Sequence, residues 1–139
     1  MKQDEKELQE KYMEMKMAEE QIKEMQKQVQ LVEQQLIELM STIQSLEEFK
    51  KTGSGTEILV PLSPGIFAKA ELKNNREFLV NVGSNVVVVK DIESTKKLME
   101  KQVEETKALH TRVASQMQHI SMYASGLEKE LRELISKSK

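Results

Sequence analysis

Residues 8–46 read LQEKYMEMKMAEEQIKEMQKQVQLVEQQLIELMSTIQSL, and apolar residues recur along this stretch at a regular spacing. One row of residues recurs every seven positions: Leu8, Met15, Ile22, Val29, Leu36 and Ile43. A second row follows three residues behind it: Lys11, Ala18, Met25, Val32, Leu39 and Leu46. Apolar residues repeated at this heptad spacing are typical of an α-helix that winds around a partner helix. The stretch therefore predicts one helix of a coiled coil.

A matching stripe occupies the C-terminal third of the chain. Its first row is Ile92, Met99, Thr106, Val113, Ile120, Leu127 and Leu134. Its companion row is Val103, His110, Met117, Ala124 and Leu131. In an antiparallel pair, one register places Leu8 opposite Leu134 and then satisfies both rows in heptad steps. The stripes therefore predict an intramolecular hairpin of two long helices.

The composition changes sharply between the two stripes. Residues 1–51 contain no Gly or Pro and predict the first helix, which should end near residues 52–55 with a glycine cap. Residues 57–91 are rich in Val, Ile and Phe and predict four short strands at 58–62, 66–73, 77–82 and 86–90. Turn residues separate them at 63–65, 74–75 and 83–85. Asp91 or Ser94 should cap the second helix, which is expected at 92–137.

The predicted strands carry more apolar surface than they can bury among themselves. Val86–Val89 is apolar on both faces, and so small a sheet cannot cover both. Exposed apolar strands pair with other chains. We therefore expect subunit assembly through Ile58, Val60, Ile66, Phe67, Phe78, Val80, Val82, Val86 and Val88.

Composition narrows the class of protein further. The 139 residues are 32% charged and only 4% aromatic, which suits a rod with a thin seam better than a globule with a thick core. The net charge is −2 with both signs interspersed, which argues against a nucleic-acid partner. The chain has no apolar run long enough for a membrane span or a signal peptide, so we expect a cytoplasmic protein.

The order of helix, strands and helix, together with the middle segment, resembles the prefoldin family and most of all its archaeal-type α subunit. The resemblance rests on Ile58-Leu59-Val60-Pro61-Leu62, on Gly65, Phe67, Ala68 and Ala70, and on Val82-Gly83. Two hairpins between the helices indicate the α class. The resemblance implies an α+β fold: a long antiparallel two-helix coiled coil with two β-hairpins inserted between the helices, the strands contributing to an oligomeric β-barrel.

The resemblance also implies a function. It indicates an ATP-independent chaperone (a holdase) that captures non-native proteins at coiled-coil tips and delivers them to a group II chaperonin. The implied partners are prefoldin β-type subunits, in a ratio of two α to four β, unfolded client proteins and the chaperonin. One alternative is a structural tether or scaffold that oligomerises through its β-region. Another is an RNA-reading coiled-coil arm, which the balanced charges disfavour.

At the far end of the predicted arm, apolar residues leave the seam. Methionine is flexible and polarisable and suits surfaces that accept partners of many shapes. We therefore predict a client-binding tip composed of Leu8, Tyr12, Met13, Met15, Met17, Met122, Tyr123, Leu127, Leu131, Leu134 and Ile135. The alternative is that these residues only widen the seam or are single exposed apolar side chains.

No catalytic, metal or cofactor site is expected. His110 falls at a seam position opposite Val32, where a polar residue more often sets the register than binds a ligand. His119 lies near the opposite helix face, and the chain has no Cys to complete a metal site. Residues 53–55 lack the Lys that a phosphate loop needs. The chain is accordingly not expected to be an enzyme.

Overall fold

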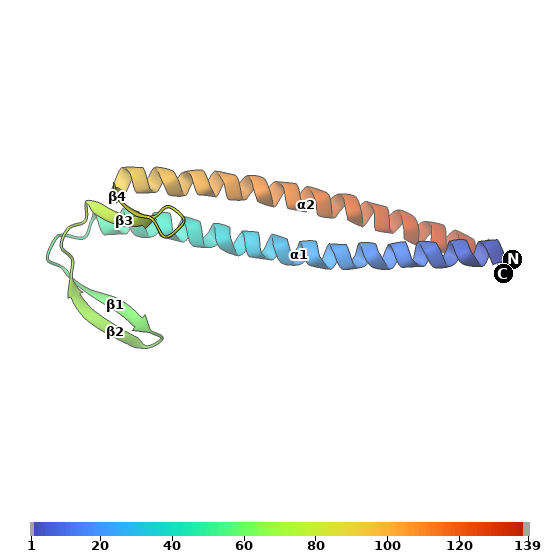
Figure 1. Ribbon diagram of the computed structural model, residues 1–139, viewed down its shortest axis with the longest axis horizontal. Coiled ribbons are helices and arrows are strands. Elements are labelled where there is room, and N and C mark those ends of the chain that lie inside the picture. Colours follow the sequence, from blue (N-terminus) through green and yellow to red (C-terminus); the bar gives the residue numbers. More distant parts are fainter. Residues whose placement is uncertain (1, 138–139) are drawn as a thin grey trace. The chain divides into compact units, whose positions relative to one another are not determined.

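The computed structural model describes residues 2–137, which form two long helices with four strands between them (Figure 1). In chain order the elements are α1 (Lys2–Lys50), β1 (Glu57–Ser63), β2 (Ile66–Glu71), β3 (Glu77–Asn81), β4 (Val87–Asp91) and α2 (Ile92–Lys137). The predicted α+β class and the predicted order of elements are both confirmed. The chain divides into two compact units. We call Met1–Gln35 with Thr106–Lys139 the terminal unit and Leu36–Glu105 the strand-bearing unit.

The terminal unit is a two-helix seam built from the predicted heptad rows. Its buried apolar residues all belong to those rows: Ala18, Val32, Val113, Leu127 and Leu131. The two helices run antiparallel, as two contacts between them show. Lys11 pairs with Glu130, and Glu33 pairs with His110. Both contacts lie within one residue of the predicted register. The predicted seam and register are therefore confirmed here.

His110 has a local partner in the terminal unit. Its Nε2 lies 3.0 Å from Glu33 Oε1 on the opposite helix, and the ring is half-buried. A polar residue at a seam position that finds one partner across the interface favours a single alignment of the helices. This contact supports the register role that the sequence indicated.

The strand-bearing unit contains two separate antiparallel hairpins, β1–β2 and β3–β4. The β1–β2 hairpin pairs Ile58 with Ala70 and Val60 with Ala68, with an irregularity between Pro61 and Ser63 before the turn. Gly65 adopts a φ of 82° in that turn, a conformation that favours glycine. The β3–β4 turn contains a run of positive φ values over residues 83–85. The two predicted hairpins and both of their turns are confirmed.

The segment between the hairpins differs from the sequence expectation. Asn74 and Asn75 were expected in a tight turn between paired strands, but β2 and β3 belong to different sheets and neither Asn has a positive φ. Asn74 Oδ1 instead accepts hydrogen bonds of 3.0 Å from the amides of Arg76 and Glu77. The strand β2 accordingly ends at Glu71, before the predicted limit of Lys73.

The end of α1 also differs in detail. Gly53 does not adopt a positive φ. Gly55 does, at 82°, but its amide donates to the Leu72 carbonyl and not to the end of α1, so neither glycine is the left-handed cap expected there. Two tighter turns close the helix, in which the amides of Lys51 and Thr52 bond the carbonyls three residues earlier. Asn75 Nδ2 then donates to the carbonyl oxygens of Lys50 at 2.9 Å and Thr52 at 2.8 Å. A side chain distant in sequence thus satisfies helix-end carbonyls that would otherwise lack partners.

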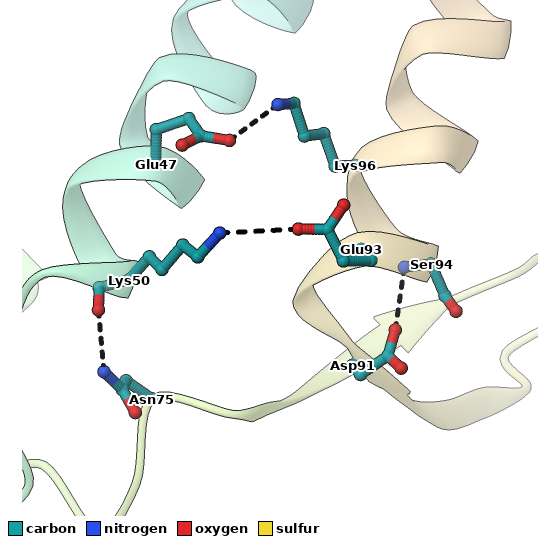
Figure 2. Close-up of polar contacts among 7 residues, drawn as sticks. All are labelled: Glu47, Lys50, Asn75, Asp91, Glu93, Ser94 and Lys96. Carbon is teal, nitrogen blue, oxygen red and sulfur yellow. Dashed lines mark hydrogen bonds and ion pairs between the residues drawn. The ribbon is translucent and has the colours of Figure 1, made fainter.

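The N-terminus of α2 is capped by Asp91 rather than by Ser94. Figure 2 shows the Ser94 amide donating to Asp91 Oδ1, at 2.7 Å. This bond is the main reason that the pKa of Asp91 is lowered, because it stabilises the carboxylate form. Thr95 is buried beside it, and its hydroxyl donates to the Asp91 carbonyl at 2.7 Å. The cap therefore joins the end of β4 directly to the first turn of α2.

Candidate functional site

The end of the terminal unit where α1 begins and α2 ends, which we call the tip, contains an apolar groove. The groove has a volume of about 440 Å³ and is lined by side chains from both helices: Leu8, Gln9, Tyr12, Met15, Glu128, Leu131, Arg132 and Ile135. Five of these eight are apolar or aromatic, and the polar members come from helix positions next to the seam. The groove brings together five of the predicted tip residues.

A second set of predicted tip residues lies outside the groove on the surface of the helices. Met13, Met17 and Met122 are 64%, 63% and 66% exposed, and Tyr123 is also exposed. Residues four apart on a helix share a face, so Met13 and Met17 present one methionine surface on α1. The expectation that apolar side chains leave the seam at this end is therefore met by their exposure.

Three of the predicted tip residues belong to the seam. Leu127 and Leu131 are only 5% and 6% exposed, and Leu134 is half-buried. Their side chains hold the two helices together, although Leu131 also forms part of the groove lining. The tip thus combines buried leucines that maintain the pair of helices with exposed methionines and tyrosines.

Polar contacts hold the tip aromatic residues in place. The Tyr123 hydroxyl donates to Glu14 Oε2 on the other helix at 2.9 Å, and this bond raises the pKa of Tyr123 because ionisation would break it. The Lys16 ammonium lies 5.3 Å from the ring centroid of Tyr12, a cation–π distance. Both rings are therefore oriented while half of their surface stays in solvent.

The strand-bearing unit exposes a second apolar surface. Of the predicted assembly residues, five are exposed: Val60, Ile66, Phe67, Val82 and Val86. The others are half-buried: Ile58, Phe78, Val80 and Val88. The half-buried face of β3–β4 includes Phe78, whose ring meets Phe49 of α1 edge-on at 6.0 Å. Exposed and half-buried residues alternate along β2, β3 and β4, so one face of these strands is more open than the other.

Five other exposed apolar residues of the strands were not among the predicted assembly residues. They are Leu59, Leu62, Leu79, Val87 and Val89, and Leu79 is 75% exposed. Leu79 and Val89 are direct cross-strand partners, so they form one apolar pair on the outer face of β3–β4. The run of four valines already indicated that both faces were apolar, but sequence alone did not show which face α1 would cover.

Ion pairs cross between the helices beside the strands. Figure 2 shows Lys96 reaching Glu47 and Lys50 reaching Glu93, at 2.7 and 3.5 Å. The shorter pair lowers the pKa of Glu47 and raises that of Lys96, chiefly through their mutual hydrogen bond. These contacts lie within one residue of the predicted register, so the antiparallel alignment also holds in the strand-bearing unit.

Three exposed apolar residues on α1 lie outside both predicted surfaces. Leu31, Ile37 and Met40 are each more than half exposed. Met40 also lines a shallow hollow of about 200 Å³ with Ile43, Val103, Glu100 and Glu104. Residues of this kind are common on soluble proteins and provide matched controls for the tip.

Over residues 2–137, no group of three or more His, Cys, Asp or Glu side chains is arranged to hold a metal ion. In the same part of the chain, neither helix has an apolar stretch long enough to span a membrane.

Comparison with known proteins agrees with this architecture. A family model described as "Prefoldin subunit" matches residues 18–137. The molecule is therefore a chaperone-type subunit built on a coiled-coil hairpin. The chain belongs to the prefoldin family.

The relatives that it resembles are archaeal. It is 30% identical over 88 residues to prefoldin subunit alpha of Thermofilum pendens, covering 63% of this chain and 68% of the relative. It is 27% identical over 87 residues to prefoldin subunit alpha of Archaeoglobus fulgidus, covering 63% of this chain and 64% of the relative. These matches span about two thirds of each relative.

A solved structure shares the fold. A chain from the cryo-EM structure of filamentous PFD from Methanocaldococcus jannaschii superposes with a TM-score of 0.76. The alignment covers 84% of this chain and 97% of that chain at 16% sequence identity. At this identity the likeness supports the fold alone.

Proposed function

We propose that this chain is a subunit of an ATP-independent holdase, which captures non-native proteins at its tip and delivers them to a group II chaperonin in the cytoplasm. The observation that carries the proposal is the apolar groove between the two helices of the tip, flanked by exposed methionines. Unfolded proteins expose short apolar segments, and a groove with flexible neighbours can accept many of them.

The size of the groove indicates weak binding by a single tip. Its volume of about 440 Å³ lies at the lower end of the range for small-molecule pockets, so it accepts only part of a client segment. Several tips in one assembly would raise the effective concentration of binding sites around a single client. Capture by weak grooves therefore requires an oligomer, which links the tip to the strands.

The proposed assembly uses the exposed strand residues. We expect the open faces of both hairpins to pack against prefoldin β-type subunits, two α with four β, in a common β-barrel. Support comes from the exposed apolar residues of β1–β4. Among them, Leu79 and Val89 lie directly opposite each other on neighbouring strands. An isolated two-stranded hairpin is marginal in water and gains stability when other strands or helices cover it.

Aggregation of an unfolded client, measured without nucleotide, tests capture directly. The tip variant is Tyr12→Ser with Ile135→Ser in the complex assembled with β-type subunits. The control is Leu31→Ser with Ile37→Ser, which removes two apolar side chains elsewhere on α1 that are even more exposed. We expect the tip variant to protect the client several-fold less than wild type, and the control to protect it fully.

The outcomes separate the competing functions. A wild-type complex that gives no protection would reject the holdase and favour a tether or scaffold. Equal protection by the tip variant and wild type would place the client surface elsewhere.

A second experiment tests assembly through the strands. Leu79→Lys with Val89→Lys should abolish the mixed complex in mass measurements, whereas Leu31→Lys should not. A mixed complex that survives the double change would reject this strand surface.

A further inference from the structure

The side chains available for oxidation are unusual in this chain. It contains nine methionines and neither cysteine nor tryptophan. Thiolates are the usual targets of peroxide in proteins, followed by the methionine thioether. With no thiol present, mild peroxide oxidation of this chain falls on methionine.

Seven of the nine methionines form two groups that differ in burial. Met15, Met25, Met99 and Met117 occupy heptad positions and are half-buried in the seam. Met13, Met17 and Met122 lie off the seam at the tip and are each more than 60% exposed. Exposure governs how readily a thioether reacts, so the tip group should react first.

We infer that Met13, Met17 and Met122 form an oxidation-sensitive site, at which peroxide converts the client-binding tip into a form that no longer captures clients. The inference rests on the proposed function of the tip. A sulfur lone pair attacks one peroxide oxygen and the O–O bond breaks. The sulfur loses two electrons and becomes a sulfoxide, and the peroxide is reduced to water.

The product differs from methionine in the property that capture needs. The sulfoxide is polar and accepts hydrogen bonds, so three apolar, flexible contact points would each become hydrated. The helix pair is not affected in the same way, because its buried apolar residues are Ala, Val and Leu, and its seam methionines are half-buried. Oxidation would therefore reduce capture while α1 and α2 stay paired, and methionine sulfoxide reductases would reverse it.

The experiment treats the assembled complex with increasing hydrogen peroxide. Peptide mass mapping measures oxygen addition at each methionine, circular dichroism measures helix content, and the client aggregation assay measures capture. We expect the three tip methionines to oxidise before the four seam methionines. Capture should fall several-fold at that stage with helix content unchanged, and reductase treatment should restore it.

Two variants make the result specific. In Met13→Leu with Met17→Leu and Met122→Leu, the ratio of treated to untreated capture should stay near one, whatever the untreated level. Met40→Leu removes an exposed methionine from the strand-bearing unit and should leave the peroxide sensitivity of capture as in wild type.

Two outcomes would overturn the inference. The seam methionines could oxidise as fast as the tip methionines, or capture could persist after the tip methionines are oxidised. A complex without capture before treatment would reject the proposed function instead, and mass mapping would still measure the order of oxidation.

Discussion

The Lys11 ammonium lies 2.8 Å from Glu130 Oε2, so an ion pair joins the two helices at a seam position where a coiled coil usually holds an apolar residue. Glu7, one turn earlier on α1, adds a second carboxylate at 3.5 Å. The hydrogen bond to Glu130 is the main reason that the pKa of Lys11 is raised. Lys11 therefore stays charged at neutral pH and favours one register at the tip.

Replacing Lys11 with Leu should raise the thermal midpoint of unfolding. The substitution adds an apolar residue to the seam, and polar seam residues gain specificity at a cost in stability. Circular dichroism on heating measures the change. The control is Lys27→Leu, which removes a long exposed pair with Glu24 and should shift the midpoint little. A lower midpoint for Lys11→Leu would show that the ion pair is itself net stabilising.

The Asp91 cap should make the start of α2 sensitive to acid. The pKa of Asp91 is lowered in the folded protein, so its contribution is present above the unfolded pKa and is lost as pH falls through the folded one. The pKa of Asp in the unfolded chain is about 4. Below that pH the stability of wild type should fall more than the stability of Asp91→Asn, whose side chain does not titrate. Thermal midpoints between pH 3 and 7 test this. Parallel curves for the two proteins would contradict it.

Asn75→Ala should loosen the join between the β3–β4 hairpin and α1. The change removes two hydrogen bonds to the carbonyls of Lys50 and Thr52, at a cost of about 1–3 kcal/mol. Asn75→Asp should cost more, because a carboxylate facing two carbonyl oxygens has no proton to donate. Chemical denaturation of both variants tests the order. Greater stability for the Asp variant would show that these bonds do not hold the join.

Leu46→Ala should destabilise the strand-bearing unit by about 2–3 kcal/mol, toward the low end for buried leucines because a two-helix seam is narrow. The matched control is Leu31→Ala, the same substitution on the same helix at a 66% exposed site. Its effect should be within about 0.5 kcal/mol. Urea unfolding monitored by helix content gives both values. Equal effects would contradict the seam assigned to α1.

Gly126→Ala should stabilise α2 by about 0.5–1 kcal/mol. Gly126 lies within the helix, its φ is not left-handed, and a Cβ built there meets nothing within 4 Å. No contact or backbone conformation therefore requires glycine at this position. Hydrogen exchange of residues 127–137 should slow in the variant. Unchanged exchange would show that the glycine does not weaken this part of the helix.

Much of the architecture follows from the sequence alone. The seven-residue period predicts both helices, and two rows of matched length allow one antiparallel register. The cross-helix pairs of Lys11 with Glu130 and Glu47 with Lys96 agree with that register. Turn residues such as Gly65 predict the hairpins because few other residues adopt a positive φ. These features depend on local conformation and periodicity, which the order of residues encodes directly.

Other features were decided only by tertiary structure. Asn75 was expected in a turn, but it caps α1. The sequence could not predict this contact, because the partner carbonyls lie more than twenty residues away along the chain. Leu79 and Val89 are exposed, whereas Phe78 on the opposite face of β3–β4 packs against Phe49 of α1. Leu127 and Leu131 were predicted both in the seam and at the client-binding tip, and packing shows that they are buried in the seam. Sequence therefore determined which residues are apolar and how they repeat, whereas contacts between distant segments decided which of them remain accessible to a partner.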